Sequence, residues 1–331
     1  MSKSTAKQNI KAIVAAINAE EKSLRARYSI LEQQNSIAMV IMLLSLCSLI
    51  GVATFYYFAV IPAWLCIILA AFITSIAHEL EHDLLHKQYF SKRPFIHNCM
   101  MLAVWLMRPN TVNPWYRRKI HLHHHKVSGT SQDIEERLVG NGIQSPFLRA
   151  VVIADGLLGL LINSKRFSKE IRGFKFSQVF NAGVPLATAY FGILYGVIAY
   201  YALQFVQPFA LPQWGTELLA VAEFVMVVLI VPNIIRSMSL NLITSSMHYY
   251  GGVSNVLEQT HVLTSRWLLP FQLFCFDFGR THTIHHFVPN QPFYIRQLIS
   301  KKIRPIMAQH GVRFDDLHSL KHANQYIAKK E

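Results

Sequence analysis

Two long stretches without charged residues dominate the pattern of hydrophobic positions. Between Glu32 and Glu79 the chain has no Asp, Glu, Lys or Arg, and this stretch is about twice the roughly 20 residues that cross a bilayer as a helix. A turn near Pro62 would divide it into two membrane spans, about Ser36 to Val60 and about Ala63 to Ala77. The pattern therefore predicts a first helical hairpin.

The second charge-free stretch runs from Phe176 to Gly215, and largely apolar sequence continues as far as Arg236. Pro212 lies in the middle of this region, where a proline is expected to mark a turn. We therefore predict a second hairpin, with spans of about Val179 to Phe205 and about Leu218 to Leu242.

The positive charges indicate an orientation in the membrane. Lys and Arg concentrate before the first span and in residues 87–175 and 266–330, whereas the two hairpin turns carry none. By the positive-inside rule, the termini and the central region are expected to be cytoplasmic, with both hairpin tips outside. The apolar segments 95–107 and 147–162 are too short or too interrupted to be spans, so we predict interfacial helices that cap the cytoplasmic side.

The composition agrees with this pattern. Of 331 residues, 52% are hydrophobic and only 15% are charged, against roughly 25% charged in an ordinary soluble domain. Intrinsic disorder is excluded because it requires low hydrophobicity. We predict an all-α integral membrane protein with about four transmembrane helices in two hairpins and a cytoplasmic helical cap that carries the histidine clusters described below.

The chain is expected to have three parts. In residues 1–35, apolar positions such as Ile13 and Ile17 recur at helical spacing among Lys and Arg, which predicts an amphipathic helix. This helix can lie on the membrane surface or pack on the protein's own domain, and the sequence does not favour either placement. Residues 36–298 are predicted to form the membrane domain with its cap, and residues 299–331 a basic tail.

The net charge and the cysteines narrow the possible functions. The formal charge of +14 is explained by cations flanking a membrane, so no nucleic-acid partner is expected. The four Cys residues show no CxxC spacing, which excludes a disulfide scaffold and a thiolate zinc site. Of greater interest are the 16 His residues.

Nine histidines form three clusters with HxxxH or HxxHH spacing. They are His78, His82 and His86; His121, His124 and His125; and His282, His285 and His286. Crowded imidazoles repel one another when they are charged and lack acceptors when they are neutral, so we expect them to share metal ions. One tetrahedral zinc takes four ligands, and eight or more histidines are therefore enough for two ions. Isolated histidines such as His97, His310, His318 and His322 are expected to be ordinary surface or core residues.

The order HxxxH, HxxHH, HxxHH, set between two hydrophobic regions, resembles the membrane fatty acid desaturase superfamily. This superfamily also includes membrane alkane and fatty acyl hydroxylases and carotenoid ketolases. The resemblance extends from about Ser36 to about Leu298. It implies two iron ions held by histidine, O2 as the oxidant, two external electrons per turnover and a membrane-embedded acyl or alkyl substrate.

The resemblance also implies the iron ligands. The first box corresponds to His78 and His82 or to His82 and His86, and His248 after the fourth span stands where the family often has an additional ligand. The expected set is His78, His82, His86, His121, His124, His125, His248, His282, His285 and His286. His123 extends the second box into a run, and neither its role nor that of Asn241 is fixed by the resemblance.

Carboxylates near the boxes are candidates to accept the outer ring N–H of a metal-bound histidine. They are Glu79, Glu81, Asp83, Asp133, Glu135 and Asp277. For Glu81 and Glu136 we expect equally well a solvated carboxylate paired with a nearby Lys or Arg. Tryptophans such as Trp105, Trp115 and Trp267 can line a substrate tunnel, but interfacial anchoring is the more common role.

We predict desaturation of a fatty acyl chain, because the HxxHH second box is typical of acyl desaturases. Hydroxylation of an acyl or alkyl chain is the alternative, which the HYYG sequence at His248 favours. A third hypothesis is a membrane metal transporter or sensor. This hypothesis predicts metal-ligating residues within the spans, and the first span has none.

The expected partners are a lipid substrate and a separate electron donor. The chain has no haem-attachment, ferredoxin-type or GxGxxG motif, so a ferredoxin, rubredoxin or cytochrome is implied by the resemblance. Basic residues beside the second box, Arg117, Arg118 and Lys119, are expected to attract an acidic carrier. We expect the protein in a bacterial inner (plasma) membrane with its active site on the cytoplasmic side.

Overall fold

The computed structural model describes residues 3–326, and these residues form helices and loops without a β-strand. Four helical stretches are long and apolar enough to cross a membrane. They are α2 (Gln34–Tyr57), α3 (Ala63–Leu85), α10 (Leu186–Val206) and the stretch Gln213–Met247, which comprises α11 (Gln213–Val225), a π-helical turn (Met226–Ile230) and α12 (Val231–Met247). The prediction of an all-helical chain with four apolar helices is confirmed.

The expected second and third spans have different bounds in the structure. Helix α3 does not end near Ala77 but continues to Leu85, so the first histidine cluster lies on the same helix as the apolar segment. The third apolar helix begins only at Leu186, because a break at Pro185 separates it from α9 (Phe176–Gly183). Proline has no N–H to continue a helical hydrogen-bond ladder, which accounts for the break.

The fourth apolar stretch extends beyond the expected Leu218 to Leu242 at both ends. A π-helical turn ends two residues before Pro232, and the helix continues through this proline. A π-turn shifts the hydrogen-bonding partner by one residue, and such turns are often associated with functional sites. Asn233 then ties this helix to the end of α4 (Pro94–Met107), since its side-chain N–H donates to the Met107 carbonyl at 3.1 Å.

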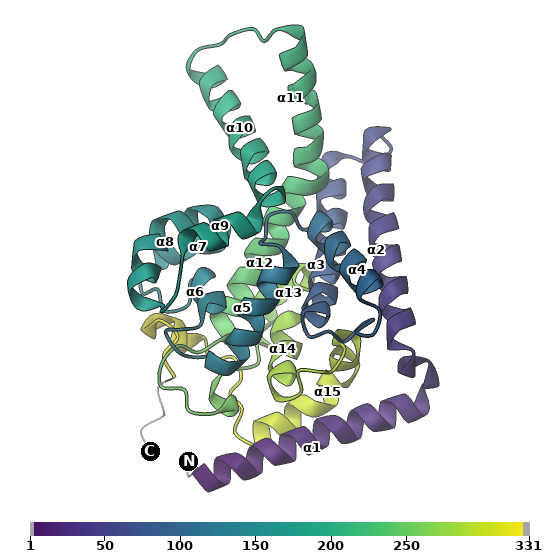
Figure 1. Ribbon diagram of the computed structural model, residues 1–331, viewed down its shortest axis with the longest axis vertical. Helices are drawn as coiled ribbons and strands as arrows, with labels where there is room; N and C mark the ends of the chain where they lie inside the picture. Colours follow the sequence, from purple (N-terminus) through teal and green to yellow (C-terminus); the bar gives the residue numbers. More distant parts are fainter. Residues whose placement is uncertain (1–2, 327–331) are drawn as a thin grey trace.

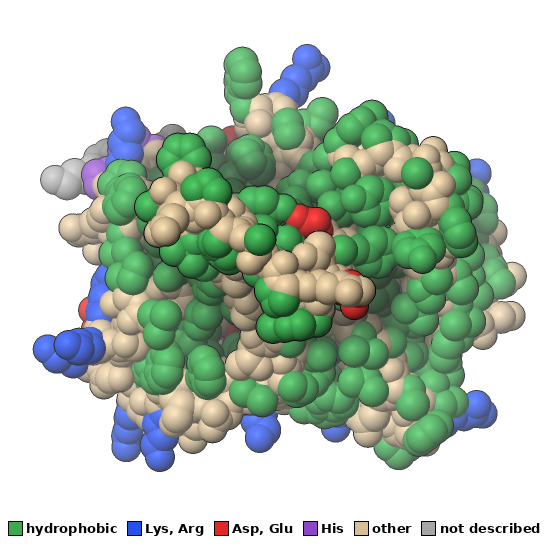
Figure 2. Space-filling model, turned by 90° about the horizontal axis from the view of Figure 1, so that it is seen from above, with side chains coloured by type: hydrophobic (Ala, Val, Ile, Leu, Met, Phe, Trp, Pro, Cys, Tyr) green, Lys and Arg blue, Asp and Glu red, His purple; other side chains and the backbone are tan. Residues whose placement is uncertain are grey.

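The loops that connect α2 to α3 and α10 to α11 lie at the same end of the molecule (Figure 1). Seen from this end, hydrophobic side chains cover most of the surface and Lys and Arg lie around its rim (Figure 2). Large apolar side chains such as Phe205, Phe58 and Trp64 are exposed there. Exposure of this kind is expected where lipid, rather than water, surrounds the helices.

The remaining helices gather at the opposite end, around α3 and α12 (Figure 1). They are α4 (Pro94–Met107), α5 (Pro114–Val127), α6 (Ile134–Leu138), α7 (Pro146–Ala154), α8 (Gly156–Glu170), α13 (Leu269–Phe274), α14 (Phe278–Phe287) and α15 (Phe293–Gln309). The apolar segment 95–107 forms one helix as expected, whereas 147–162 is divided at Asp155. The carboxylate of Asp155 caps the second helix by accepting from the Leu157 and Leu158 N–H groups, both at 2.9 Å.

Helix α1 (Lys3–Arg27) packs on the protein's own domain, the second of the two placements expected from the sequence. Ile13 and Ile17 are fully buried against a cluster that includes Ile299 and Ile303 of α15. Helix α15 runs without a break across residue 298. The apolar face of α1 is therefore covered by protein rather than by lipid headgroups.

We predict that Ile13→Ala destabilises the protein by about 2–5 kcal/mol, the usual cost of truncating a buried aliphatic side chain to alanine. The apparent Tm in detergent measures this effect. Lys11→Ala, on the exposed face of the same helix, serves as the control and should change stability by less than about 0.5 kcal/mol. An unchanged Tm for Ile13→Ala would show that α1 does not depend on this contact.

Candidate metal centre

Histidines from α3, α5, α14 and the C-terminal end of α12 meet in the interior. Their ligand atoms form two groups, within each of which all ligand atoms lie within 4.8 Å of one another. Group one is His82, His86, His121 and His285, and group two is His124, His248, His282 and His286. Two nitrogens on opposite sides of one metal ion are about 4 Å apart, given metal–nitrogen bonds of about 2 Å. Each group therefore has the dimensions of a metal site.

The HxxHH spacing explains why each box contributes to both groups. Residues three apart on a helix lie on adjacent faces, displaced by about 60°, because one turn takes 3.6 residues. On α5, His121 belongs to group one and His124 to group two. On α14, His285 belongs to group one and His282 to group two. Two ions side by side can thus be held by the same pair of helices.

Helix α5 is positioned by its own sequence. Asn113 caps its N-terminus by accepting from the Tyr116 N–H at 2.9 Å, and Pro114 occupies the first turn, where its missing N–H costs nothing. The Asn113 amide also donates to the Ala182 carbonyl at 2.9 Å, which joins the start of α5 to α9. These contacts fix where the second histidine box begins.

In group one the ring nitrogens approach one another closely. His86 Nε2 lies 3.0 Å from His121 Nε2. His125 Nε2 is 3.3 Å from His121 Nε2 and 2.9 Å from His285 Nε2, so His125 lies against this group without being one of its four members. The nitrogen atoms therefore point toward a common centre rather than toward backbone acceptors.

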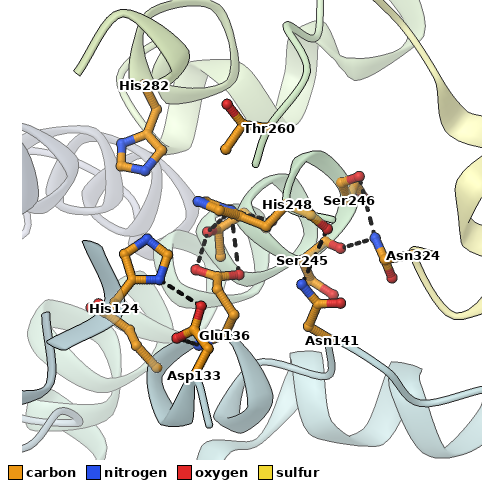
Figure 3. A network of polar contacts seen from close by, with 12 residues as sticks. His124, Asp133, Glu136, Asn141, Ser245, Ser246, His248, Thr260, His282 and Asn324 are labelled. Carbon is orange, nitrogen blue, oxygen red and sulfur yellow. Dashed lines mark hydrogen bonds and ion pairs between the residues drawn. The ribbon is translucent and has the colours of Figure 1, made fainter. Parts of the chain in front are cut away.

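Group two shows the same arrangement. His286 Nε2 lies 3.2 Å from the Nε2 atoms of both His248 and His282. The side chains of His124, His248 and His282 come from three different elements and turn toward one another (Figure 3). His248 is the C-cap residue of α12. The end of the fourth apolar stretch therefore places a histidine beside those of the second and third boxes.

The outer Nδ1 atoms of two α5 histidines are held by carboxylates at the start of α6. Nδ1 of His124 is 2.8 Å from Asp133 Oδ2, and Nδ1 of His121 is 2.7 Å from Glu135 Oε2. Such contacts fix the ring orientation and the tautomer of a metal-binding histidine. Of the carboxylates proposed for this role from the sequence, Asp133 and Glu135 are in the required position.

Other polar groups hold Nδ1 in group two. Nδ1 of His248 lies 2.9 Å from the Thr244 carbonyl oxygen and 3.3 Å from Glu136 Oε2. Nδ1 of His286 lies 2.9 Å from the side-chain oxygen of Gln259. With Nδ1 engaged in this way, Nε2 is the nitrogen that faces the other histidines.

The electrostatics of the interior favour neutral imidazoles on α14. Burial, together with neighbouring imidazoles, holds the pKa values of His282, His285 and His286 well below their usual range. Neutral imidazole is the form that binds metals. Burial also opposes the charged form of His124, but the Asp133 carboxylate outweighs it and raises the pKa of His124 to about 10. Burial raises the pKa of Glu136 to about 8.

The test of whether metal ions fit is the state of His82. It is 2% exposed, and within residues 3–326 neither of its ring nitrogens has a hydrogen-bond partner. A buried polar atom without a partner costs about 1–3 kcal/mol, and native structures rarely keep one without a reason. A metal ion in group one would bind one of the two His82 ring nitrogens. The residues present therefore fit such an ion.

The structure distinguishes between the two possible histidine pairs of the first box, His78 with His82 and His82 with His86. His82 and His86 join group one, whereas His78, one turn earlier on α3, lies outside both groups. His78 is nevertheless buried beside the Phe278 ring, with a distance of 5.6 Å between ring centroids. His123 is exposed and points away from both groups.

Several carboxylates differ from the expectations. Glu81 is not solvated but forms a buried ion pair with Arg108 and Arg117. Glu136 is buried as well, next to His248. Asp277 pairs with Arg280 at 3.0 Å and holds no histidine.

Two residues of the site were missed from the sequence. Arg296 of α15 is 1% exposed and lies 3.4 Å from His285 Nδ1, 3.1 Å from Asp83 and 3.4 Å from Glu79. Gln259, described above, comes from the loop after His248. Both residues are far in sequence from the histidines that they contact, and no spacing pattern marks them.

The basic residues beside the second box mostly point inward, contrary to expectation. Arg117 pairs with Glu81, and Arg118 donates to the Leu84 and Leu85 carbonyls at 2.8 and 3.1 Å. Lys119 is the exposed member of the three. The side chains of the two arginines therefore brace α5 against other parts of the protein instead of forming an open basic surface.

A cavity of about 480 Å³ lies between α5, α8, α9, α10 and α12, and no histidine is among the described residues that line it. Most of its walls are apolar, with Ile120, Leu160 and Leu194 among them. Glu135, which holds His121, also lines it. The cavity thus extends from the lipid-facing helices to the support of one metal group.

A family model described as fatty acid desaturase matches residues 58–318, which is more than half of the chain. No curated protein matches it significantly.

We predict that Asp133→Asn lowers metal affinity about 10–100-fold, because it weakens the contact that orients His124. Metal content after dialysis against a chelator, measured by mass spectrometry, tests this. Asp277→Asn is the matched control, since its carboxylate lies outside both groups and pairs with Arg280. Equal metal retention in the two variants would contradict a role for Asp133 at the metal.

Proposed function

The chain belongs to the fatty acid desaturase family, and from this premise we propose that it is a membrane-bound oxidoreductase that desaturates a fatty acyl chain. In this proposal it holds two iron ions and uses O2 and two external electrons. The observation that carries the proposal is the division of eight histidines, seven of them buried and His86 half-buried, into two adjacent groups of four. One metal ion bound in each group would explain why the histidines form two groups.

Iron agrees with the chemistry of the ligands. Imidazole nitrogen suits zinc, copper, iron and nickel, and the membership of the family favours iron among these. His125 is 2.9 Å from His285 Nε2, so we assign it as a further ligand near group one. His78 lies outside both groups. Both of its ring nitrogens are also buried without a hydrogen-bond partner in the described chain, and this observation and the family resemblance are what support a part in metal binding. When bound, the irons supply the activation of O2 and the removal of hydrogen from an unactivated methylene, which side chains cannot perform.

The residues of the chain provide the setting for this chemistry. Asp133, Glu135 and Gln259 fix the orientation of three histidine rings. The cavity beside Glu135 offers an apolar space in which a hydrocarbon chain can lie next to group one. Its volume is within the range of about 300–1,000 Å³ that is usual for small-molecule sites. The apolar side chains of its walls would keep water away from a hydrocarbon chain bound there.

Hydroxylation of an acyl or alkyl chain is the alternative, and the HYYG sequence at His248 is what favours it. Both reactions begin with removal of one hydrogen from the substrate. They differ in whether a second hydrogen is then lost or a hydroxyl group is added. The same arrangement of histidines is compatible with desaturation and with hydroxylation. The two reactions are therefore distinguished by their products.

We further propose that four transmembrane helices form two hairpins and that the end bearing the histidines faces the cytoplasm of a bacterial inner membrane. The Lys and Arg distribution supports this orientation. An acidic electron carrier of the ferredoxin, rubredoxin or cytochrome type would approach from that side. Lys87, Lys119 and Lys126 are exposed near the histidine boxes and would attract such a carrier.

We predict about two irons per chain in the purified wild-type protein. His248→Gln should lose about half of this iron, because glutamine keeps a similar length but is a poor iron ligand and group two has only four histidines. Iron quantification on protein purified from iron-replete cells is the measurement. The matched control is His123→Gln, an exposed neighbour of the ligands on α5, which should keep full iron. Stoichiometric zinc without iron, or full iron in His248→Gln, would refute the assignment.

Lipid mass spectrometry of cells that express the protein tests the reaction itself. We expect acyl chains with new double bonds in cells with the wild-type protein and none in cells with His125→Ala, at equal protein levels. New hydroxyl groups that depend equally on His125 would instead establish the hydroxylase alternative. Identical lipids in the two cell lines, with an added electron donor, would contradict both.

A further inference from the structure

Three buried or half-buried arginines line one part of the 480 Å³ cavity. They are Arg108, Arg117 and Arg236. The opposite walls are apolar, with Val179, Phe191 and Leu194 from α9 and α10. The cavity therefore combines a cationic region with an apolar region. These two regions are complementary to the anionic head and the hydrocarbon chain of an amphipathic ligand.

Two of the three arginines are paired with carboxylates. Arg108 and Arg117 both pair with Glu81, and Arg117 also lies 3.6 Å from Glu135. Arg236 differs from them. Among the described residues no carboxylate lies within 4.0 Å of its guanidinium, and its contacts are with the amide oxygens of Asn233 at 3.0 Å and Asn110 at 2.9 Å.

The two carboxylates in the cavity wall, Asp155 and Glu135, are engaged elsewhere. Asp155 accepts a hydrogen bond from the Tyr195 hydroxyl at 2.6 Å and caps α8 through the Leu157 N–H. Glu135 accepts from His121 at 2.7 Å. Neither carboxylate neutralises Arg236.

Arg236 is 1% exposed and lies in α12, within the fourth apolar stretch. A buried cation is costly unless it is paired, and an ionisable residue inside a membrane-spanning segment usually marks a ligand or ion site. Two amide oxygens provide partial negative charge but no neutralisation. The Arg236 guanidinium can therefore form an ion pair with an anion that enters the cavity.

We propose that Arg236, together with Asn110, binds the anionic head group of a single-chain lipid whose hydrocarbon chain lies along the apolar walls of the cavity. This inference rests on the proposed function, because it names the class of substrate: an acyl chain that carries its own carboxylate or phosphate. Arginine suits both groups, since its planar guanidinium can donate two parallel hydrogen bonds to either.

The position of Arg236 also separates the head group from His248 of group two. Arg236 precedes His248 by twelve residues on one continuous helix, which corresponds to about 18 Å at 1.5 Å per residue. A head group at Arg236 would thus leave the chain free to extend toward the histidines. The carboxyl end would be recognised at a distance from the ligands of group two.

A purely structural role is the rival explanation, because the contact of Arg236 with Asn110 ties α12 to the loop before α5. The experiment therefore compares ligands as well as variants. Purified protein in non-ionic detergent is titrated at pH 8 with cis-parinaric acid, a fluorescent polyunsaturated fatty acid, and with its methyl ester. The ester has the same chain but no charge.

We expect the wild-type protein to bind the acid at least tenfold more tightly than the ester. Arg236→Met should reduce acid binding to the level of the ester while ester binding stays within about threefold. The matched control is Arg149→Met: this arginine is also buried and without a carboxylate partner in the described chain, but it contacts Ser245 and does not line the cavity. Its preference for the acid should equal that of the wild type. Displacement by hexadecanoic acid or by hexadecyl phosphate then identifies a carboxylate or a phosphate as the preferred head group.

Equal binding of acid and ester by the wild-type protein would overturn the proposal whether or not any variant folds. A loss of both ligands to the same extent in Arg236→Met and Arg149→Met would also overturn it, because it would show a structural role. Should Arg236→Met not fold, Arg236→Lys replaces it and should retain a weakened preference for the acid. Binding requires no O2 and no electrons, so a confirmed preference without any oxidised lipid would reject the desaturase proposal and leave this one standing.

Discussion

Buried imidazole nitrogens must be satisfied, and the arrangement of this protein follows from that requirement. Eight histidines meet in an interior where unpaired polar atoms are costly. Asp133, Glu135, Gln259 and backbone oxygens account for several outer nitrogens, but the inner Nε2 atoms face only one another. Facing nitrogens cannot all donate and accept among themselves. Metal cations in the two groups would satisfy these inner nitrogens.

This requirement explains the buried arginines that surround the histidines. Arg296 joins α15 to α3 through Asp83 and Glu79, and Arg108 joins the end of α4 to α3 through Glu81. All of these side chains are almost fully buried, and breaking such a pair by removing one partner costs about 3–5 kcal/mol. They fix α3 from two sides, immediately beside His82, so the helix cannot rotate its histidines out of register.

The sequence predicted what depends on local spacing. The apolar stretches, the HxxHH boxes and the place of His248 after the fourth stretch could all be recognised because each is encoded within one helix. The choice of His86 over His78 for group one could not, because both lie on the same helical face and the difference depends on where α5 and α14 approach α3. Gln259 and Arg296 were missed for the same reason: their partners lie on other helices, and no periodicity connects them. The burial of Glu81 likewise depends on Arg108, 27 residues away.

The length of α3 relates the metal groups to the membrane. From Ala63 to His82 the helix rises about 29 Å at 1.5 Å per residue, close to the roughly 30 Å thickness of the hydrocarbon core. If Ala63 lies at one boundary of the hydrocarbon, as the proposed topology has it, group one would lie near the other boundary rather than at the centre. The adjacent cavity is walled on one side by α10 and α12, which are apolar enough to span the membrane, and on the other by α5, which carries the second histidine box. A lipid chain in this cavity can approach the histidines while remaining in apolar surroundings, so the chain does not have to cross water to reach them.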